Sequence, residues 1–184
     1  MYKGEREMDY RLFEWINGWA GKYGWLDLLM IVMTDYGPYL FAILLGVLLL
    51  LKKHRSGGIL AGCTLALALS FSFMIGQLWE RARPFVTHDN VNLLLSKEPN
   101  ASFPSDHTTG AFAIAFALCH YNKTLGNILL ILALLIGISR PYVGHHYPGD
   151  VFAGMTVAFL AAQLVQYGMK RFRARSANVS ETAS

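Results

Sequence analysis

The chain has 184 residues, of which 54% are hydrophobic and 15% are charged, and its formal net charge is +4 at pH 7. The apolar residues are gathered in long runs, which excludes an ordinary soluble domain and indicates a membrane protein with several spans. The basic residues cluster in short loops and near the C-terminus, where membrane topology accounts for them, so we expect no nucleic-acid partner. Cys63 and Cys119 lie far apart within apolar runs and are expected to be reduced packing residues.

Residues 1–24 are predicted to form an N-terminal interfacial amphipathic helix. The first residues carry charges where a signal peptide needs an apolar segment, so we expect no cleavage. Apolar side chains would share one helical face, opposite a polar face, as in a helix that lies in the membrane interface. This apolar face consists of Met8, Leu12, Trp15, Ile16 and Trp19. A soluble amphipathic helix and a partly inserted helix are the alternatives.

Residues 25–170 are predicted to form one all-α membrane domain, a polytopic helical bundle of about five spans. The longest uncharged runs approach the roughly 20 residues that cross a bilayer as a helix. Gly37 and Pro38 predict a break within the first span. The expected helices are residues 25–51 with that break, 58–83, 105–121, 124–139 and 148–169.

Residues 171–184 are expected to form a cytoplasmic basic and polar tail, disordered from residue 176 onward. Positively charged loops remain on the cytoplasmic side of a membrane, which fixes the orientation of the predicted spans. The residues that carry this signal are Lys52, Lys53, Arg55, Lys123, Lys170, Arg171, Arg173 and Arg175. This orientation brings three polar clusters together on the extracytoplasmic side.

The first cluster lies where the predicted helix over residues 58–83 ends. Gly76, Glu80 and Arg83 would share one face of that helix, which Pro84 terminates. A guanidinium held there can bind two phosphate oxygens at once. The alternative is an arginine that only extends its charge to the membrane interface.

The second cluster, PSDHTTG, opens the next predicted helix. Ser105 is expected to be the N-cap, so the backbone amides from Asp106 onward would face a bound anion. His107, in the first turn, would then act on that anion as an acid or a base. A helix cap with a polar neighbour and no further function is the alternative.

The third cluster, GISRPYVGHHYPGD, contains Arg140, His146 and Asp150. An aspartate that accepts the proton of one ring nitrogen fixes the histidine tautomer and raises the basicity of the other nitrogen. A polar loop at the membrane edge is the alternative. Because all three clusters meet on one side of the membrane, their convergence favours a functional site.

The histidines in these clusters also raise the question of a metal site. His107, His145, His146 and Asp150 are residue types that bind zinc. Two arginines in the same pocket, however, would repel a divalent cation and attract an oxyanion. We therefore expect no metal and no other cofactor.

These residues resemble the type 2 phosphatidic acid phosphatases, whose three motifs are K-x6-R-P, P-S-x-H and S-R-x5-H-x3-D. Residues 104–107 match the second motif, and residues 139–150 match the third at full spacing. Arg83 and Pro84 match the end of the first motif, but Gly76 stands in the place of its lysine. The resemblance covers about residues 25–170.

The resemblance implies a membrane helical bundle and a metal-free phosphohistidine mechanism. His146 would attack phosphorus, Asp150 would orient and activate His146, and His107 would protonate the leaving group. Two further hypotheses concern this sequence itself: Glu80 would orient Arg83, one turn away, and either Arg81 or a water would replace the missing lysine. The groups expected to hold the phosphate oxygens are Arg83, Ser105, Arg140 and the backbone amides from Asp106 onward.

Within the family, SFPSDHTTGA and SRPYVGHHYPGD most resemble the bacterial undecaprenyl-pyrophosphate phosphatases of the bacitracin-resistance type. This implies a multi-pass enzyme of the bacterial plasma membrane that recycles the cell-wall lipid carrier and faces the extracytoplasmic side. Its partners would be a polyprenyl pyrophosphate lipid and the bilayer. Phosphatidylglycerol phosphate or a broader set of lipid phosphates is the alternative substrate.

Two other classes of protein compete with the enzyme. A lipid-binding or lipid-scrambling protein would use the same cationic pocket without turnover. A transporter would need polar residues along its spans, whereas here the polarity lies at one end of apolar runs. Residues 85–99, which contain Val91 and residues 93–95, are either an amphipathic lid over the site or a plain surface turn.

Overall fold

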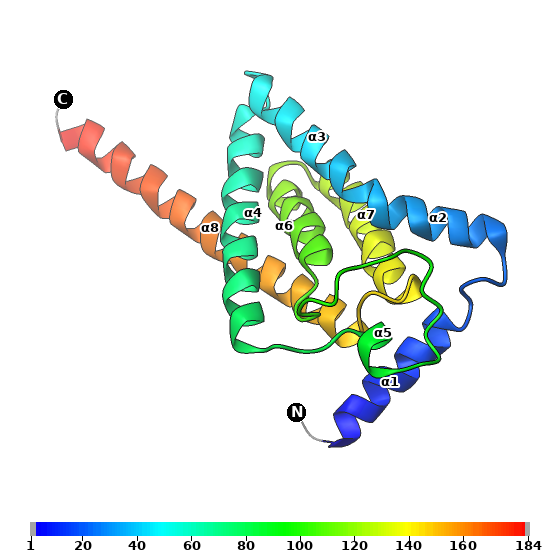
Figure 1. Cartoon of the computed structure of the whole chain (residues 1–184). Coiled ribbons are helices and arrows are strands. Elements are labelled where there is room, and N and C mark those ends of the chain that lie inside the picture. The colour runs from blue at the N-terminus through cyan, green and yellow to red at the C-terminus, as the bar shows by residue number, and fades with distance from the viewer. Residues whose placement is uncertain (1–2, 183–184) are drawn as a thin grey trace.

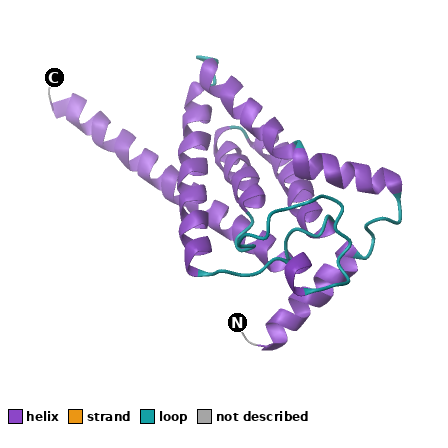
Figure 2. Cartoon of the chain, viewed as in Figure 1, coloured by secondary structure: helices purple, strands orange, loops and turns teal. Residues whose placement is uncertain are grey.

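The computed structural model describes residues 3–182, with side chains described for residues 7–172 and 175. Within that part of the chain all regular structure is helical, which confirms the predicted fold class (Figure 2). The helices are α1 (Lys3–Asn17), α2 (Gly24–Asp35), α3 (Gly37–Leu50), α4 (Arg55–Leu78), α5 (Pro84–Thr87), α6 (Asp106–Tyr121), α7 (Lys123–Tyr142) and α8 (Pro148–Thr182).

Helix α6 forms the centre of the bundle. It packs against α4, α7 and α8, and Figure 1 shows it between α4 and α7. Four of its buried residues are Ala111, Ala113, Ala115 and Ala117. Small side chains allow helix backbones to approach closely, which is a common way for helices to associate in membranes. The apolar core of the protein therefore lies around α6.

Three helices are long and apolar enough to cross a membrane: α4, α7 and the Pro148–Phe172 part of α8. The pair α2 and α3, bent by 43° at its break, passes the same test as one unit and gives up to four spans. Helix α6 has only 16 residues and is covered by its neighbours. The fifth predicted span is therefore not confirmed.

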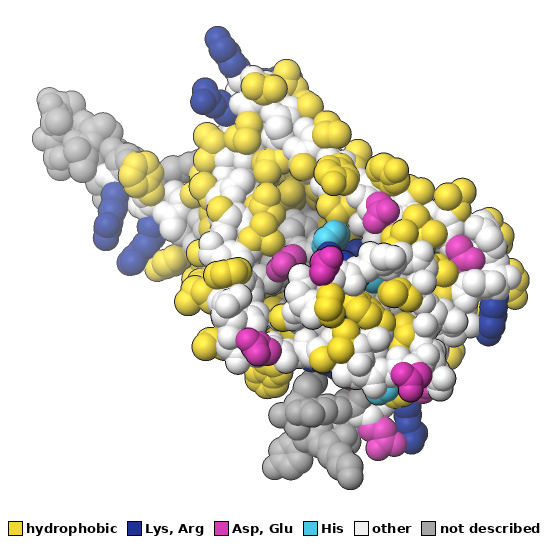
Figure 3. All heavy atoms as spheres, viewed as in Figure 1, with side chains coloured by type: hydrophobic (Ala, Val, Ile, Leu, Met, Phe, Trp, Pro, Cys, Tyr) yellow, Lys and Arg dark blue, Asp and Glu magenta, His cyan; other side chains and the backbone are white. Residues whose placement is uncertain are grey.

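Large apolar side chains cover the outside of the bundle. Leu50, Phe73, Leu78 and Phe152 are all exposed, and Figure 3 shows many apolar side chains over α3 and α4. An apolar surface of this extent is unfavourable in water and favourable against lipid tails. The exposed side chains are those of an integral membrane protein.

The predicted break in the first apolar segment is confirmed between α2 and α3. Pro38 lies in the first turn of α3, where its missing amide hydrogen is not needed. Gly37 packs so closely against α7 that an added Cβ would lie 2.7 Å from Ile136 Cγ1. The bend therefore depends on a glycine at this position.

The predicted helix over residues 58–83 is wrong at its C-terminal end. Helix α4 ends at Leu78, and Trp79 leaves it with φ −130° and ψ 81°. Arg83 is extended, with φ −71° and ψ 156°, as expected for a residue before proline. In extended backbone, side chains two positions apart lie on the same side of the chain. Arg81 and Arg83 can therefore approach the start of α8 together.

The predicted disorder of the C-terminal segment is also corrected. Helix α8 continues to Thr182, so residues 176–182 are helical, and residues 183–184 lie outside the described part of the chain. The assignment of residues 171–184 to the cytoplasm stays a prediction.

Helix α1 packs against α7 and α8. Phe13 is buried, with its ring centroid 5.7 Å from that of Tyr147. Asn17 is also buried and donates a hydrogen bond to the carbonyl oxygen of Tyr142 at 2.8 Å. The face that we expect to contact the membrane interface is largely exposed on the protein surface. Its exposed side chains are Met8, Leu12, Trp15 and Trp19. Its interfacial position stays a prediction.

Candidate active site

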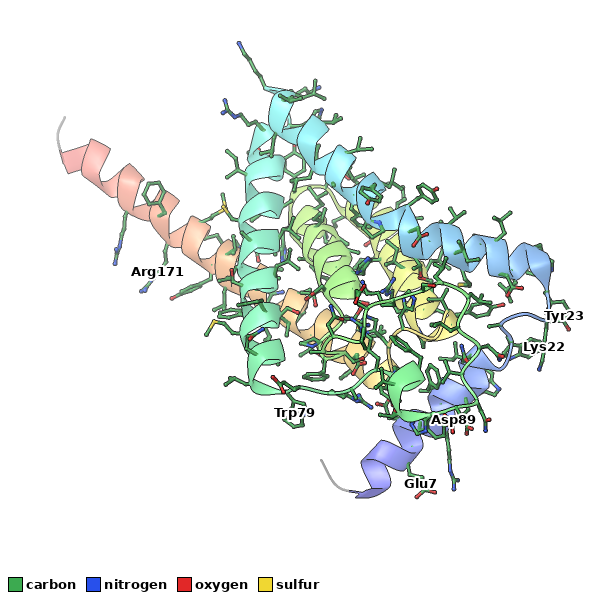
Figure 4. All side chains as sticks on the ribbon, in the orientation of Figure 1. Glu7, Lys22, Tyr23, Trp79, Asp89 and Arg171 are labelled. Carbon is green, nitrogen blue, oxygen red and sulfur yellow. The ribbon has the colours of Figure 1, made fainter. Side chains whose placement is uncertain are left out.

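Three polar segments meet at one end of the bundle. Arg83 Nη1 lies 3.0 Å from His146 Nε2, and the amide of Ser105 donates to the carbonyl oxygen of Asp150 at 3.1 Å. The first, second and third motif regions are therefore in direct contact. Figure 4 shows Trp79 at the end of α4 near this region, with Arg171 far from it along α8.

His146 is buried in a defined tautomer at the centre of this site. Its Nδ1 lies 2.8 Å from the carbonyl oxygen of Ser102, which can only accept, so Nδ1 carries the proton. Its Nε2 accepts from Arg83, which can only donate. Burial, followed by the charges of Arg140 and Arg83, lowers the pKa of His146 well below its ordinary value. His146 is therefore neutral at pH 7, with an unprotonated Nε2.

Asp150 does not make the hydrogen bond to His146 that the sequence predicts. Its Oδ2 is 3.6 Å from His146 Nδ1, whereas the carbonyl oxygen of Ser102 is at 2.8 Å. Asp150 is fully buried and accepts hydrogen bonds from Ser102 Oγ, the amide of Tyr147 and Arg81. Its contact with His146 is electrostatic, and the orienting hydrogen bond comes from Ser102.

Ser102 is thus a site residue that sequence reasoning missed. Its carbonyl oxygen orients His146, and its hydroxyl binds Asp150. It lies immediately outside the second motif, and a serine in a loop carries no distinctive sequence signal. Only the folded arrangement reveals its two contacts.

Arg83 is in the site, as predicted, and its direction is fixed by the loop that follows it. Nε and Nη2 donate to Asn100 Oδ1 at 3.0 and 2.7 Å. Nη1 donates to the carbonyl oxygen of His145 at 2.9 Å as well as to His146. The side chain is only 4% exposed. Asn100 is therefore the group that orients Arg83, a role that we expected of Glu80.

Glu80 and Arg81 do not have the surroundings that the sequence predicts for them. Glu80 is exposed, and no ion pair within 4.0 Å involves it among the described residues. Arg81 is bound on both sides, with Nη1 2.7 Å from Asp150 Oδ1 and Nη2 2.6 Å from Asp9 Oδ2. Arg81 is therefore engaged by carboxylates, which leaves it poorly placed to replace the missing lysine.

Ser105 occupies the N-cap position of α6, as predicted, but without the expected side-chain cap. Its Oγ accepts a hydrogen bond from Thr108 Oγ1 at 3.0 Å instead of one from a backbone amide. Asp106 is exposed, and its side chain accepts from Ser72 at 2.8 Å. Because the side chain of Asp106 is engaged with Ser72, the feature of this turn suited to an anion is the set of backbone amides that begin the helix.

His107 and Arg140 lie at the border between the polar site and the apolar bundle. His107 lines a cavity of about 530 Å³ together with Asp35 and Tyr39. Arg140 is only 1% exposed, and its Nε has no hydrogen-bond partner among the described residues. A buried donor without a partner is costly, so this nitrogen is available to an anionic ligand.

An apolar pocket of about 250 Å³ adjoins His107 on the side of α3 and α4. It is lined by Pro38, Phe41, Ala42, Leu65, Leu69, Asp106, His107, Gly110, Ala111 and Ile114. A ligand with a phosphate in the polar site and an apolar chain attached to it could occupy both regions.

Lys97 is a second residue that sequence reasoning missed. The loop that carries it is held on one side by His145 Nε2, which donates to the carbonyl oxygen of Leu95 at 2.9 Å. On the other side it is held by the bonds of Arg83 to Asn100. Burial, followed by the charges of Arg83 and Arg140, lowers the pKa of Lys97. Lys97 therefore adds a cation near the two arginines, although no motif includes it.

The charged groups of this site suit an anion. Within the described residues, no three or more His, Cys, Asp or Glu side chains are grouped so that they could hold a metal ion. Arg83 and Arg140 lie near His146, and Lys97 lies within electrostatic reach of the same two arginines. The expectation of a metal-free reaction stays a prediction.

Comparisons with known proteins find a family of phosphatases, which agrees with an anion-binding site. The model of the PAP2 superfamily matches residues 57–174. The chain is 38% identical over 155 residues to undecaprenyl-diphosphatase BcrC of Bacillus subtilis (strain 168), covering 83% of this chain and 80% of that protein. It is 35% identical over 161 residues to bacitracin transport permease protein BcrC of Bacillus licheniformis, covering 86% and 79%.

Solved structures show a similar arrangement of helices. The crystal structure of Aquifex aeolicus LpxE matches with a TM-score of 0.77 and 28% identity, covering 87% of this chain and 95% of that one. The phosphatidylglycerolphosphate phosphatase from Bacillus subtilis matches with a TM-score of 0.72 and 22% identity, covering 92% and 88%. The second match shows the fold alone. With the three motif regions in contact and the family model matched over most of the bundle, the chain belongs to the PAP2 superfamily.

Proposed function

We propose that this PAP2 membrane lipid phosphatase hydrolyses undecaprenyl diphosphate to undecaprenyl phosphate and inorganic phosphate. The observation that carries the proposal is the state of His146, a buried neutral imidazole whose unprotonated Nε2 lies among Arg83 and Arg140. A neutral nitrogen nucleophile surrounded by cations is suited to attack a phosphoryl group. The two relatives named BcrC support the choice of lipid.

In the first step the terminal phosphate binds among the cations. Its oxygens accept hydrogen bonds from Arg83, Arg140, Ser105 and the first amides of α6, which stabilise the charge on the equatorial oxygens. A phosphate oxygen replaces His146 Nε2 as an acceptor for Arg83, which frees the nitrogen lone pair. Nε2 attacks phosphorus, and the bond from phosphorus to the bridging oxygen breaks.

His107 acts on the leaving group. The bridging oxygen keeps the electron pair of the broken bond and takes a proton from His107, which releases undecaprenyl phosphate. Arg140 and Lys97 lie within electrostatic reach of His107, and the negative charge of the bound diphosphate offsets these cations, so that His107 can carry the proton that it donates. Ser102 and Asp150 stabilise the positive charge on the phosphorylated ring, the first by its carbonyl oxygen and the second by its negative charge.

In the second step water attacks the phosphohistidine. His107 accepts a proton from this water, the phosphorus–nitrogen bond breaks, and its electron pair returns to Nε2. Inorganic phosphate leaves, and His146 regains its starting tautomer because the carbonyl oxygen of Ser102 still holds the Nδ1 proton. The same histidine pair therefore serves both halves of the reaction.

Lys97 takes over the role of the family lysine, whose position in this sequence is occupied by Gly76. A diphosphate carries more negative charge than a phosphate monoester, and a third cation beside the arginines neutralises the additional charge. Arg81 cannot serve in this way while Asp9 and Asp150 bind it. Lys97 thereby favours diphosphate substrates.

The location of the site fits recycling of the cell-wall lipid carrier. In the orientation set by the basic loops, the site faces the extracytoplasmic side of a bacterial plasma membrane and the C-terminus lies in the cytoplasm. An enzyme that removes undecaprenyl diphosphate there also removes the target of bacitracin, so it would confer resistance to that antibiotic. Phosphatidylglycerol phosphate is the second candidate, because the polar site suits a phosphate and does not by itself select the lipid chain.

The test is phosphate release by the purified protein in detergent, with a chelator present. Undecaprenyl diphosphate and phosphatidylglycerol phosphate are compared for the parent protein and for His146→Ala. We expect fast release from undecaprenyl diphosphate, slow release from phosphatidylglycerol phosphate, and none with His146→Ala. Equal rates on both lipids would remove the carrier-recycling role, and no release from either would favour a binding or scrambling protein.

The requirement for a metal is tested in the same assay. We expect full activity in chelator and inhibition by vanadate, which mimics five-coordinate phosphorus. Loss of activity in chelator, restored by one metal, would contradict the proposed mechanism.

A further inference from the structure

A carboxylate of the N-terminal helix reaches the catalytic region through one arginine. Asp9 Oδ2 accepts from Arg81 Nη2 at 2.6 Å, and Asp150 Oδ1 accepts from Arg81 Nη1 at 2.7 Å. The side chains of Asp9, Arg81 and Asp150 are 9%, 14% and 0% exposed. The guanidinium thus joins α1 to the first turn of α8 in a largely buried ion triad.

Asp9 also holds the backbone next to Asp150. Its Oδ1 accepts a hydrogen bond from the amide of Gly149 at 2.8 Å. The fit is close, because a Cβ added to Gly149 would lie 2.8 Å from Asp9 Oδ2. One carboxylate therefore fixes both the start of α8 and the guanidinium that binds Asp150.

Aromatic side chains around Arg81 restrict the rotation of its guanidinium further. The Arg81 guanidinium carbon lies 3.8 Å from the centroid of the Tyr147 ring. Tyr147 itself packs on Phe13 of α1, and its hydroxyl bonds to Thr87 at 2.7 Å. A guanidinium stacked on a ring and bound at both ends has little rotational freedom.

Arg81 helps to set the orientation of the Asp150 carboxylate beside the ring of His146. It occupies Oδ1, while Oδ2 accepts from Ser102 Oγ and from the amide of Tyr147 and lies 3.6 Å from His146 Nδ1. If the guanidinium were released, the carboxylate would be held at Oδ2 alone and could change its tilt and its distance from the ring.

We propose that Asp9 is a positioning residue for catalysis, and that α1 completes the active site by holding Arg81 on Asp150. This inference rests on the proposed roles of His146 and Asp150. It assigns to the N-terminal helix a function that neither the three motifs nor the family match over residues 57–174 includes. A helix that only anchors the protein to the membrane would not need a buried carboxylate at this place.

The experiment separates the charge of Asp9 from its packing. In Asp9→Asn the side-chain oxygen can still accept from Gly149, so α1 stays docked, while the ionic bond to Arg81 is lost. Phosphate release is measured in detergent on undecaprenyl diphosphate and on phosphatidylglycerol phosphate, with kcat and KM determined for the lipid that the parent hydrolyses. Glu7→Gln is the matched control, because Glu7 lies on the same helix and, among the residues that the structure describes, forms an ion pair only with exposed Arg11.

We expect Asp9→Asn to lower kcat about tenfold with KM within about twofold of the parent, and Glu7→Gln to change neither. Asp9→Glu should recover part of the lost activity. A double-mutant cycle with Arg81→Met tests the route: if Asp9 acts through Arg81, Asp9→Asn should have less than about twofold further effect in that background.

Three kinetic outcomes would overturn the inference. They are an unchanged kcat for Asp9→Asn, a rise in KM without a fall in kcat, and additive effects of Asp9→Asn and Arg81→Met. Failure of the proposed function can be distinguished from failure of this inference, because the parent protein would then prefer another lipid or release no phosphate. A large fall in the melting temperature of Asp9→Asn that Glu7→Gln does not share would reduce Asp9 to a folding role and would also reject the inference.

Discussion

Ser102 contacts His146 with its backbone and Asp150 with its side chain, so one residue links the proposed nucleophile to the acidic group beside it. The carbonyl oxygen lies 2.8 Å from His146 Nδ1, and the hydroxyl donates to Asp150 Oδ2. Because a backbone carbonyl cannot donate, the ring has only one compatible tautomer. The backbone therefore contributes what the sequence pattern assigns to the aspartate.

Removal of the Ser102 hydroxyl should weaken catalysis without releasing the ring. In Ser102→Ala the carbonyl oxygen still binds Nδ1, but Asp150 loses a buried hydrogen bond to a charged group, a contact of about 1.5–3 kcal/mol. We expect kcat to fall about tenfold or more, measured by phosphate release, with the melting temperature recorded alongside. Ser70→Ala is the control, because Ser70 is exposed and its hydroxyl donates to the carbonyl oxygen of Ala66 in its own helix. An unchanged kcat would show that the hydroxyl has no part in the site.

Replacement of Lys97 should affect diphosphates more than monophosphates. Lys97→Gln removes a cation near Arg83 and Arg140, and the additional charge of a diphosphate is then less well neutralised. We expect kcat/KM to fall about 10- to 100-fold on undecaprenyl diphosphate and less than about fivefold on phosphatidylglycerol phosphate. Lys97→Arg should retain most of the activity, and Lys22→Gln, exposed beside Trp19, is the control. Equal losses on both lipids would make Lys97 a general phosphate contact.

The stability of the protein should fall in acid partly because of His145. Burial and the charge of Arg140 lower the pKa of His145 to about 4. Between pH 6.5 and about 4 the unfolded chain binds a proton at this residue and the native protein does not, so unfolding becomes easier as pH falls. The expected contribution is about 1.4 kcal/mol for each pH unit in that window.

His145→Gln tests this pH dependence, because its amide nitrogen can still donate to the carbonyl oxygen of Leu95. Melting temperatures in detergent are measured between pH 7 and pH 4.5. The variant should lose less stability than the parent over this range, so the difference between their melting temperatures should become smaller toward pH 4.5. Parallel curves for the two proteins would rule out His145 as a source of the acid sensitivity.

Filling the apolar pocket beside His107 should weaken binding of the lipid chain. Gly110 lines this pocket, and a Cβ there would lie 3.4 Å from Leu65 Cδ1, which is ordinary contact. We expect Gly110→Leu to raise KM for undecaprenyl diphosphate about tenfold while leaving hydrolysis of a short-chain isoprenyl diphosphate within about threefold. Gly62→Leu is the control, since a Cβ at Gly62 meets no atom within 4 Å. A similar loss on the short substrate would place the pocket outside the lipid path.

The all-α fold and much of the site are predictable from the sequence, because both depend on local patterns. Apolar runs define the membrane helices, and the spacing from Arg140 to His146 and Asp150 follows a family motif. The end of α4 is not predictable in this way, because the first residue after its apolar run that terminates a helix is Pro84, whereas the helix already ends at Leu78. That early end changes the neighbours of Glu80 and Arg81.

The contacts that sequence reasoning missed join segments far apart in the chain. Asn100 orients Arg83, and the loop around Lys97 is held by His145. Neither pairing has a periodic pattern, because both lie in irregular backbone whose path is set by tertiary hydrogen bonds. Residues 85–99, which we considered as a lid, are tied down as well, since Asn17 and Asn92 exchange hydrogen bonds.

The bond from Gly149 to Asp9 has a consequence for biosynthesis. The two residues are 140 positions apart in the chain. During translation α1 emerges first, yet its carboxylate finds its amide partner only after the last apolar helix has entered the membrane. Contacts of such long separation form late. The contact between α1 and the start of α8 therefore forms late, after most of the chain has been made.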